Sequence, residues 1–120
     1  MKILIADDSR AMRSVIAHML REAGFRGHEI LEASDGAQAL EVVESREPDL
    51  IISDWNMPHM SGIEFLQRLR ADGHATPFGF VTTEVSAGMR HQANESGAVF
   101  LIGKPFTSDD FRNALSDIVD

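Results

Sequence analysis

The sequence contains no cysteine and no long apolar stretch. Without cysteine it cannot form a disulfide framework, and it offers no thiolate ligands for zinc. No run approaches the roughly 18 apolar residues that a membrane-spanning helix needs, and no apolar signal region stands at the N-terminus. We therefore expect neither export nor membrane insertion, and a cytoplasmic location.

Positive charge is also scarce. Eleven lysines and arginines stand against nineteen aspartates and glutamates, which gives a formal net charge of −8. Nucleic-acid binding needs a basic patch, and the basic residues here are scattered, so we expect no contact with nucleic acid. Hydrophobic residues make up 43% of the chain, which predicts one folded domain over residues 1–120 with a single core.

Five short apolar runs alternate with five segments of helical periodicity. This alternation predicts an α/β protein with a parallel sheet, helices on both faces and right-handed crossovers. Charged residues flank the second run, which suits a strand at the edge of the sheet. The predicted strands cover residues 2–6, 29–33, 50–53, 78–81 and 99–102, and the predicted helix caps are Ser9, Asp35, Ser61, Ser86 and Thr107.

The helical segments differ in how well they are specified. Asp35 and Gln38 resemble a capping box, as do Ser61 with Glu64 and Thr107 with Asp110. The fourth segment is poor in apolar residues, which predicts weak packing and a mobile element. The predicted inward residues are Leu40, Val42 and Val43 for the second segment, Ala87, Met89 and Ala93 for the fourth, and Phe111, Ala114, Leu115, Ile118 and Val119 for the fifth.

Polar side chains follow four of the five predicted strands. Asp7 and Asp8 follow the first, Asp54 the third, Thr82 the fourth, and Lys104 comes soon after the fifth. Because the carboxyl ends of parallel strands lie side by side, these residues should converge. Three neighbouring carboxylates repel one another, and a hard divalent ion such as Mg²⁺ would relieve the conflict. A carboxylate can attack phosphorus, so we predict that Asp54 accepts a phosphoryl group, with Lys104 as a second cation and Thr82 as a hydroxyl donor.

These motifs resemble the receiver domain of two-component response regulators. The similarity covers essentially the whole chain and is strongest to the single-domain chemotaxis regulators of that family. It implies a flavodoxin-like fold, with a five-stranded parallel sheet in the order 2-1-3-4-5 flanked by five helices. The matching stretches are Asp7-Asp8, Ile52-Ser53-Asp54-Trp55-Asn56-Met57-Pro58, Arg70-Ala71-Asp72-Gly73 and Lys104-Pro105-Phe106-Thr107.

The resemblance implies how the site would bind its metal and phosphate. Asp8 and Asp54 would bind Mg²⁺ directly, together with the backbone carbonyl of Asn56, and Asp7 would act mainly through water. Lys104 would contact the phosphoryl group, and its bond to Pro105 is cis in the family.

Five positions bear on switching and phosphate lifetime in the family. Thr82 would move its hydroxyl toward the phosphate, and the pairing of Asn56 with Glu84 predicts a short-lived phosphorylated state. Thr83 replaces a smaller residue, and it either crowds the phosphate or adds a hydroxyl. Leu101 stands where Tyr or Phe is usual. It is either an ordinary core residue or the sign of an altered switch in which the fourth helix carries the coupling.

Several functions remain open at this point. The favoured one is a stand-alone monomeric receiver, because no residue follows Asp120 to form an effector domain. A sensor histidine kinase would phosphorylate it, and the surface of the fourth helix, fifth strand and fifth helix would bind a partner such as a flagellar motor switch component.

The alternatives are a phosphorelay or phosphate-sink receiver outside motility, an unphosphorylated interaction module, and a Mg²⁺-dependent phosphohydrolase. The last is disfavoured, because haloacid-dehalogenase-type enzymes need a second acid two residues after the nucleophile, where Asn56 stands. We expect no enzymatic turnover of external substrates.

Overall fold

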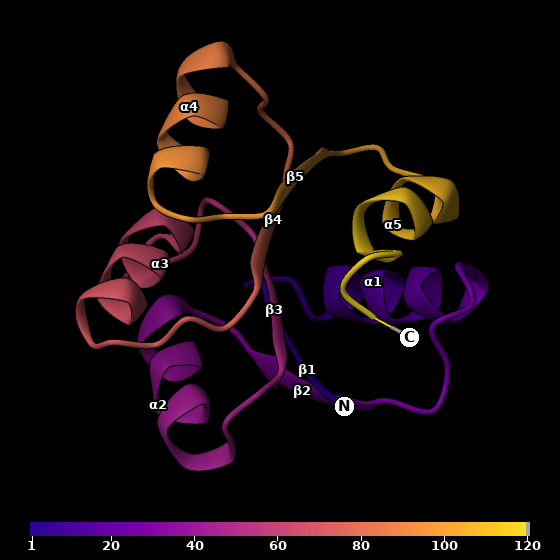
Figure 1. Ribbon diagram of the computed structural model, residues 1–120, viewed down its shortest axis with the longest axis horizontal. Coiled ribbons are helices and arrows are strands. Elements are labelled where there is room, and N and C mark those ends of the chain that lie inside the picture. The colour runs from indigo at the N-terminus through magenta and orange to yellow at the C-terminus, as the bar shows by residue number, and fades with distance from the viewer. Residues whose placement is uncertain (120) are drawn as a thin grey trace.

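A computed structural model describes residues 1–119 as a parallel five-stranded sheet with helices on both faces (Figure 1). The strand order is β2-β1-β3-β4-β5, which confirms the predicted architecture and the edge position of the second strand. The predicted domain end, Asp120, lies outside the described residues. The strands are β1 (Lys2–Ala6), β2 (Glu29–Ala33), β3 (Leu50–Ser53), β4 (Phe78–Thr82) and β5 (Phe100–Gly103), and the helices are α1 (Arg10–Glu22), α2 (Gly36–Arg46), α3 (Gly62–Ala71), α4 (Ala87–Glu95) and α5 (Ser108–Leu115).

The sheet separates two apolar layers. In Figure 1, α2, α3 and α4 lie on one side of the sheet, and α1 and α5 lie on the other. Residues of β1 alternate between them: Leu4 and Ala6 belong to the first layer, and Ile3 and Ile5 to the second. Because both faces are covered, a central strand must be apolar at every position, which explains the continuous apolar runs in the sequence.

Each helix begins at the predicted cap. The side chain of every cap residue accepts a hydrogen bond from the backbone N–H three residues later. Reciprocal capping boxes form at Ser61 and Thr107, as predicted. The predicted box at Asp35 is wrong, because Gln38 Oε1 accepts from the N–H of Ser34 instead.

Two predicted inward faces need correction. In α2 the buried residues are Gly36, Ala39 and Val43, of which only Val43 was predicted, and the predicted Leu40 and Val42 are partly buried and pack against the same core. In α4 Ala87 is exposed, and Ala93 alone is fully buried. A helix that anchors itself through one small side chain gains little from burial, which agrees with the weak packing predicted for this element.

Two predicted boundaries near the C-terminus are also wrong. Strand β5 starts at Phe100, where pairing with Gly79 begins, and Val99 remains 55% exposed. Helix α5 ends at Leu115, so Ile118 and Val119 pack from the following turn. Among residues 1–119 no helix is long and apolar enough to cross a membrane.

Candidate functional site

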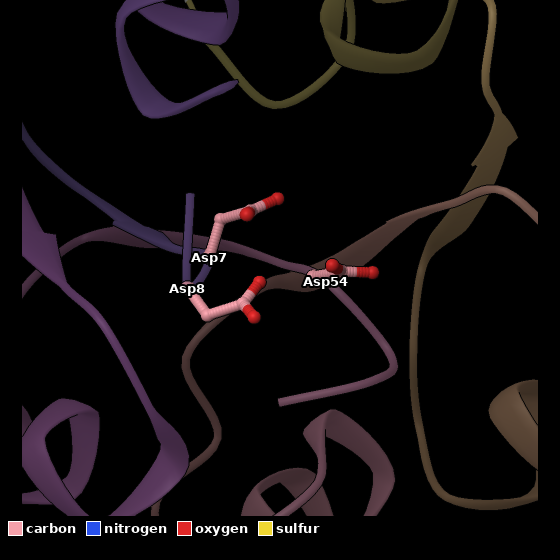
Figure 2. A group of neighbouring side chains, drawn as sticks. All are labelled: Asp7, Asp8 and Asp54. Carbon is pink, nitrogen blue, oxygen red and sulfur yellow. The ribbon is translucent and has the colours of Figure 1, made fainter. Parts of the chain in front are cut away.

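Three carboxylates meet beyond the ends of two neighbouring strands. Asp7 and Asp8 follow β1 and Asp54 follows β3, and these strands pair in register up to Ala6 and Ser53. One carboxylate oxygen from each acid lies within 4.8 Å of the other two. Figure 2 shows the three side chains gathered beyond the strand ends. The predicted convergence of these acids is therefore confirmed.

Lys104 reaches the same group of acids from the loop after β5. Its Nζ lies 3.3 Å from Asp7 Oδ2 and 3.6 Å from Asp54 Oδ2. The lysine side chain is only 13% exposed, so these contacts are shielded from solvent. Its backbone N–H donates to the carbonyl of Thr82, and its peptide bond to Pro105 is cis, as the resemblance implied. Lys104 therefore contacts two of the three acids, Asp7 and Asp54.

Asp7 is held at each of its polar groups. Its side chain is 1% exposed, and Oδ1 accepts a hydrogen bond of 2.8 Å from the N–H of Ser9 while Oδ2 faces Lys104. Its backbone N–H donates to the carbonyl of Ala33, and its own carbonyl accepts from Arg13 Nη1 at 2.7 Å. Asp7 is thus a fixed, buried charge that is already engaged by the protein.

Asp8 is the opposite case. Its side chain is exposed, and within residues 1–119 its carboxylate has no hydrogen-bond partner. A carboxylate in this state keeps all its lone pairs available for a ligand.

Asp54 lies between these extremes, with a side chain that is 12% exposed. Its Oδ1 accepts a hydrogen bond of 2.7 Å from the N–H of Trp55. Burial is the largest influence and raises the pKa of Asp54 above its ordinary value. Lys104 and the N–H of Trp55 oppose this rise in pKa, and the charge of Asp7 adds to it. The ionised form of Asp54 is therefore short of compensating positive charge.

The first turn of α3 supports the loop that carries Asp54. A Cβ on Gly62 would lie 2.0 Å from the carbonyl oxygen of Asp54, so no larger residue fits there without movement. The N–H of Gly62 also donates to the carbonyl of Trp55 at 2.7 Å. The partly exposed Trp55 ring lies 4.7 Å from that of Phe80. The role of Gly62 was not predicted, although a glycine inside a capping box directly after the motif was a usable signal.

The remaining predicted residues differ in how far they are buried. Thr82 is fully buried at the end of β4, and its hydroxyl accepts from the N–H of Glu84 at 3.4 Å. Asn56, Thr83 and Glu84 are exposed. The structure thus gathers the carboxylates of Asp7, Asp8 and Asp54, places Lys104 beside Asp7 and Asp54, and leaves Asn56, Thr83 and Glu84 exposed.

Leu101 is partly buried and packs with the layer beneath α4, whereas Phe100 packs with the opposite layer, as strand alternation predicts. A hollow of about 160 Å³ lies beside Leu101 and is also lined by Arg90 and Ala93 of α4. Leu101 therefore borders a hollow between β5 and α4. Whether it alters a switch stays a prediction.

The donor set fits a hard divalent cation. It offers three carboxylates and neither histidine nor cysteine, and oxygen ligands of this kind suit Mg²⁺. The acids carry three negative charges against the single charge of Lys104, so two negative charges remain for a divalent ion to balance.

Residues 3–116 match the family model of the response regulator receiver domain. The chain belongs to this family. It is 37% identical over 120 residues to chemotaxis protein CheY-3 of Vibrio cholerae, covering 98% of this chain and 91% of that protein. It is 38% identical over 120 residues to chemotaxis protein CheY of Pseudomonas aeruginosa, covering 98% and 95%.

Solved structures agree with this assignment. The chemotaxis response regulator CheY4 of Vibrio cholerae superposes with a TM-score of 0.84 at 34% identity, covering 98% of each chain. The fold is therefore that of a response regulator receiver domain, which is a signalling domain.

Proposed function

We propose that this receiver domain takes a phosphoryl group from a phosphohistidine of a sensor histidine kinase onto Asp54. A carboxylate oxygen of Asp54 attacks phosphorus, an O–P bond forms as the P–N bond breaks, and the imidazole leaves. The observation that supports this proposal is the cluster of three carboxylates within 4.8 Å, with Lys104 3.6 Å from Asp54.

The acids divide into different roles around a bound Mg²⁺ ion. Asp8 and Asp54 are the proposed direct ligands, with the backbone carbonyl of Asn56 as a third. Asp7 acts through water, since its oxygens already engage Ser9 and Lys104. When bound, Mg²⁺ neutralises part of the negative charge on the phosphoryl oxygens during transfer.

Lys104 and Thr82 would contact the transferred group. Lys104 Nζ lies close enough to Asp54 to meet a phosphoryl oxygen after a small side-chain movement. Thr82 would exchange its weak 3.4 Å hydrogen bond from Glu84 for one to the phosphate, which gives the domain a switch. The exposed Asn56, Thr83 and Glu84 tune water access, and we expect a short-lived phosphorylated state. A half-life of many hours for the purified phosphoprotein would contradict that expectation.

We place the output surface on α4, β5 and α5. A hollow of about 540 Å³ lies on this edge, and α4 is anchored by Ala93 alone among its residues. An element with so little buried area can shift at small cost when the phosphorylated site changes shape. The hollow is lined by Arg90, Phe100, Leu101, Ile102, Gly103, Pro105, Asp110, Asn113 and Ala114.

The chemotaxis names of the relatives favour a pathway in motility, with a flagellar motor switch component as the partner. A phosphorelay or phosphate sink is the second candidate, since the same site serves both. Two assays separate these candidates. One measures binding of the phosphorylated domain to motor switch proteins of the source cell, and the other measures transfer of its phosphoryl group to phosphotransfer proteins of the same cell.

Intact mass spectrometry tests the phosphorylation itself. Incubation with Mg²⁺ and a small acyl-phosphate donor should add one phosphoryl group, and either EDTA or Asp54→Asn should abolish the gain. Asp117→Asn makes the same chemical change at an exposed position away from the site and should leave the gain intact. No gain in the wild-type protein would instead favour an unphosphorylated interaction module, and rapid turnover of phosphomonoesters would favour a phosphohydrolase.

A further inference from the structure

Arg13 connects helix α1 to both the acidic site and the edge of the sheet. Its side chain is 13% exposed, so the guanidinium is largely removed from water. Nη1 donates to the carbonyl oxygen of Asp7 at 2.7 Å, and Nε donates to Glu32 Oε1 of β2 at 2.9 Å. One planar group therefore holds two acceptors in a fixed relation, which a lysine cannot do.

The carbonyl that Arg13 holds belongs to the peptide joining Asp7 to Asp8. The other polar groups of Asp7 are bonded to Ser9, Ala33 and Lys104, so this residue is fixed. The carboxylate of Asp8 has no partner within residues 1–119, so its position depends on the backbone that precedes it. A rotation of the peptide between the two acids would move the Asp8 carboxylate away from Asp54.

We infer that Arg13 is a positioning residue for the metal site, and that it sets the direction of Asp8 by clamping the peptide between Asp7 and Asp8. Glu32 orients the guanidinium and neutralises its charge. This inference rests on the proposed Mg²⁺ site. It adds to that site a residue of helix α1 that touches neither the ion nor the phosphoryl group. Arg13 also lies outside the sequence motifs that predicted the site.

Charge and geometry make opposite predictions for the loss of Arg13. If only charge mattered, Arg13→Met would remove a positive group and leave Glu32 unpaired, so the site would become more negative and bind Mg²⁺ more tightly. If Arg13 acts by holding the peptide, the same substitution frees Asp8 and binding becomes weaker. The sign of the change therefore identifies the mechanism.

The experiment measures the Mg²⁺ dissociation constant of the unphosphorylated protein by titration calorimetry, with Trp55 fluorescence as a second signal. We expect Arg13→Met to raise the dissociation constant about tenfold, the lower end of what residues supporting metal ligands contribute. Arg21→Met makes the same charge change on an exposed residue near the other end of α1 and should change it less than about twofold. In an Asp8→Asn background, Arg13→Met should add little, because the residue it positions is already disabled.

A second measurement needs no metal. The chemical shift of the Asp7 carbonyl carbon reports its hydrogen bond, and in EDTA it should change in Arg13→Met but not in Arg21→Met. Arg13→Lys keeps the charge and can reach only one acceptor, so its dissociation constant should lie between those of the wild type and Arg13→Met. This variant remains informative if Arg13→Met fails to fold.

The outcomes separate the inference from the proposed function. If the wild-type protein binds Mg²⁺ and Arg13→Met or Arg13→Lys binds it equally well or more tightly, the positioning role of Arg13 is wrong and the proposed metal site is unaffected. The positioning role is also wrong if Arg13→Met weakens Mg²⁺ binding equally in the wild-type and Asp8→Asn backgrounds, because the effect would then not pass through Asp8. A wild-type protein that binds no Mg²⁺ overturns both.

Discussion

Replacing Asp8 by asparagine should stabilise the Mg²⁺-free protein while removing its response to Mg²⁺. Lys104 lies within 4 Å of Asp7 and Asp54, and no such contact joins it to Asp8. The exposed Asp8 therefore adds a third negative charge that has no cation within 4 Å in the described residues. Asparagine keeps the shape of the side chain and removes this charge.

The size of the effect follows from the spacing. Two unit charges at the 4.8 Å limit of this cluster repel by about 0.9 kcal/mol in water and about 3.5 kcal/mol at an effective dielectric constant of 20. The aqueous figure suits an exposed group, so two acidic neighbours give roughly 1–2 kcal/mol at low salt. We expect Asp8→Asn to raise the free energy of unfolding in EDTA by this amount, and by less at high salt.

Urea unfolding followed by circular dichroism measures the change. Glu41→Gln removes one exposed acid from α2 and controls for net charge. With Mg²⁺ at ten times its dissociation constant, the wild-type protein should gain about 1.4 kcal/mol and Asp8→Asn almost nothing. The advantage of the variant over the wild type should therefore shrink or reverse when Mg²⁺ is added.

Two results would refute this reasoning. If Asp8→Asn is less stable than the wild type in EDTA at low salt, the acids are not held in mutual repulsion. If the variant gains as much stability from Mg²⁺ as the wild type does, Asp8 is not a ligand.

Three further predictions concern close packing and protonation. Gly62→Ala should destabilise the protein by roughly 1–3 kcal/mol and impair phosphorylation of Asp54, because the new methyl would meet the Asp54 carbonyl. Gly88→Ala on α4, whose Cβ would make only an ordinary 3.9 Å contact with Ser86 Oγ, should instead raise stability by up to about 1 kcal/mol. Urea unfolding and intact mass measure the two effects. Gly79→Ala should destabilise the protein by a similar roughly 1–3 kcal/mol, because the new Cβ would lie 2.1 Å from the Phe100 ring. This loss of stability should largely vanish in a Phe100→Ala background, and an undiminished loss there would show that the clash lies elsewhere. Hydrogen bonds from the N–H and hydroxyl of Ser61 lower the pKa of Glu64. The contribution of Glu64 to stability should therefore be complete above its pKa in the unfolded chain and be lost as the pH falls through its pKa in the folded protein. An NMR titration should show the pKa of Glu64 rising toward its ordinary value in Ser61→Ala.

Local rules predicted the elements well because each rule acts over a few residues. The five caps were found because a side-chain oxygen satisfies a free N–H within its own turn. One error arises where a distant strand decides, and another where two nearby N–H groups compete for one acceptor. Val99 is a β-branched residue of the kind typical of strands, but it precedes the first paired residues of β4 and β5, which are Gly79 and Phe100. Gln38 has the spacing of a capping box, but Ser34 offers its N–H as an alternative donor.

The sequence by itself determined the fold class and predicted which four charged residues converge at one end of the sheet. Continuous apolar runs specify strands covered on both faces, and a polar residue that follows such a run must then lie at the common edge of a parallel sheet. Asp7, Asp8, Asp54 and Lys104 could therefore be named before any distance was known.

Only the tertiary structure decided how these residues are held and how they differ. It buries Asp7, exposes Asp8, presses Gly62 against the backbone of Asp54, and brings Arg13 from a helix to the peptide between the two acids. These contacts join residues whose types and spacing follow no periodic rule. They depend on how a helix packs against the strand end and loop that precede it, and a linear pattern does not encode that geometry.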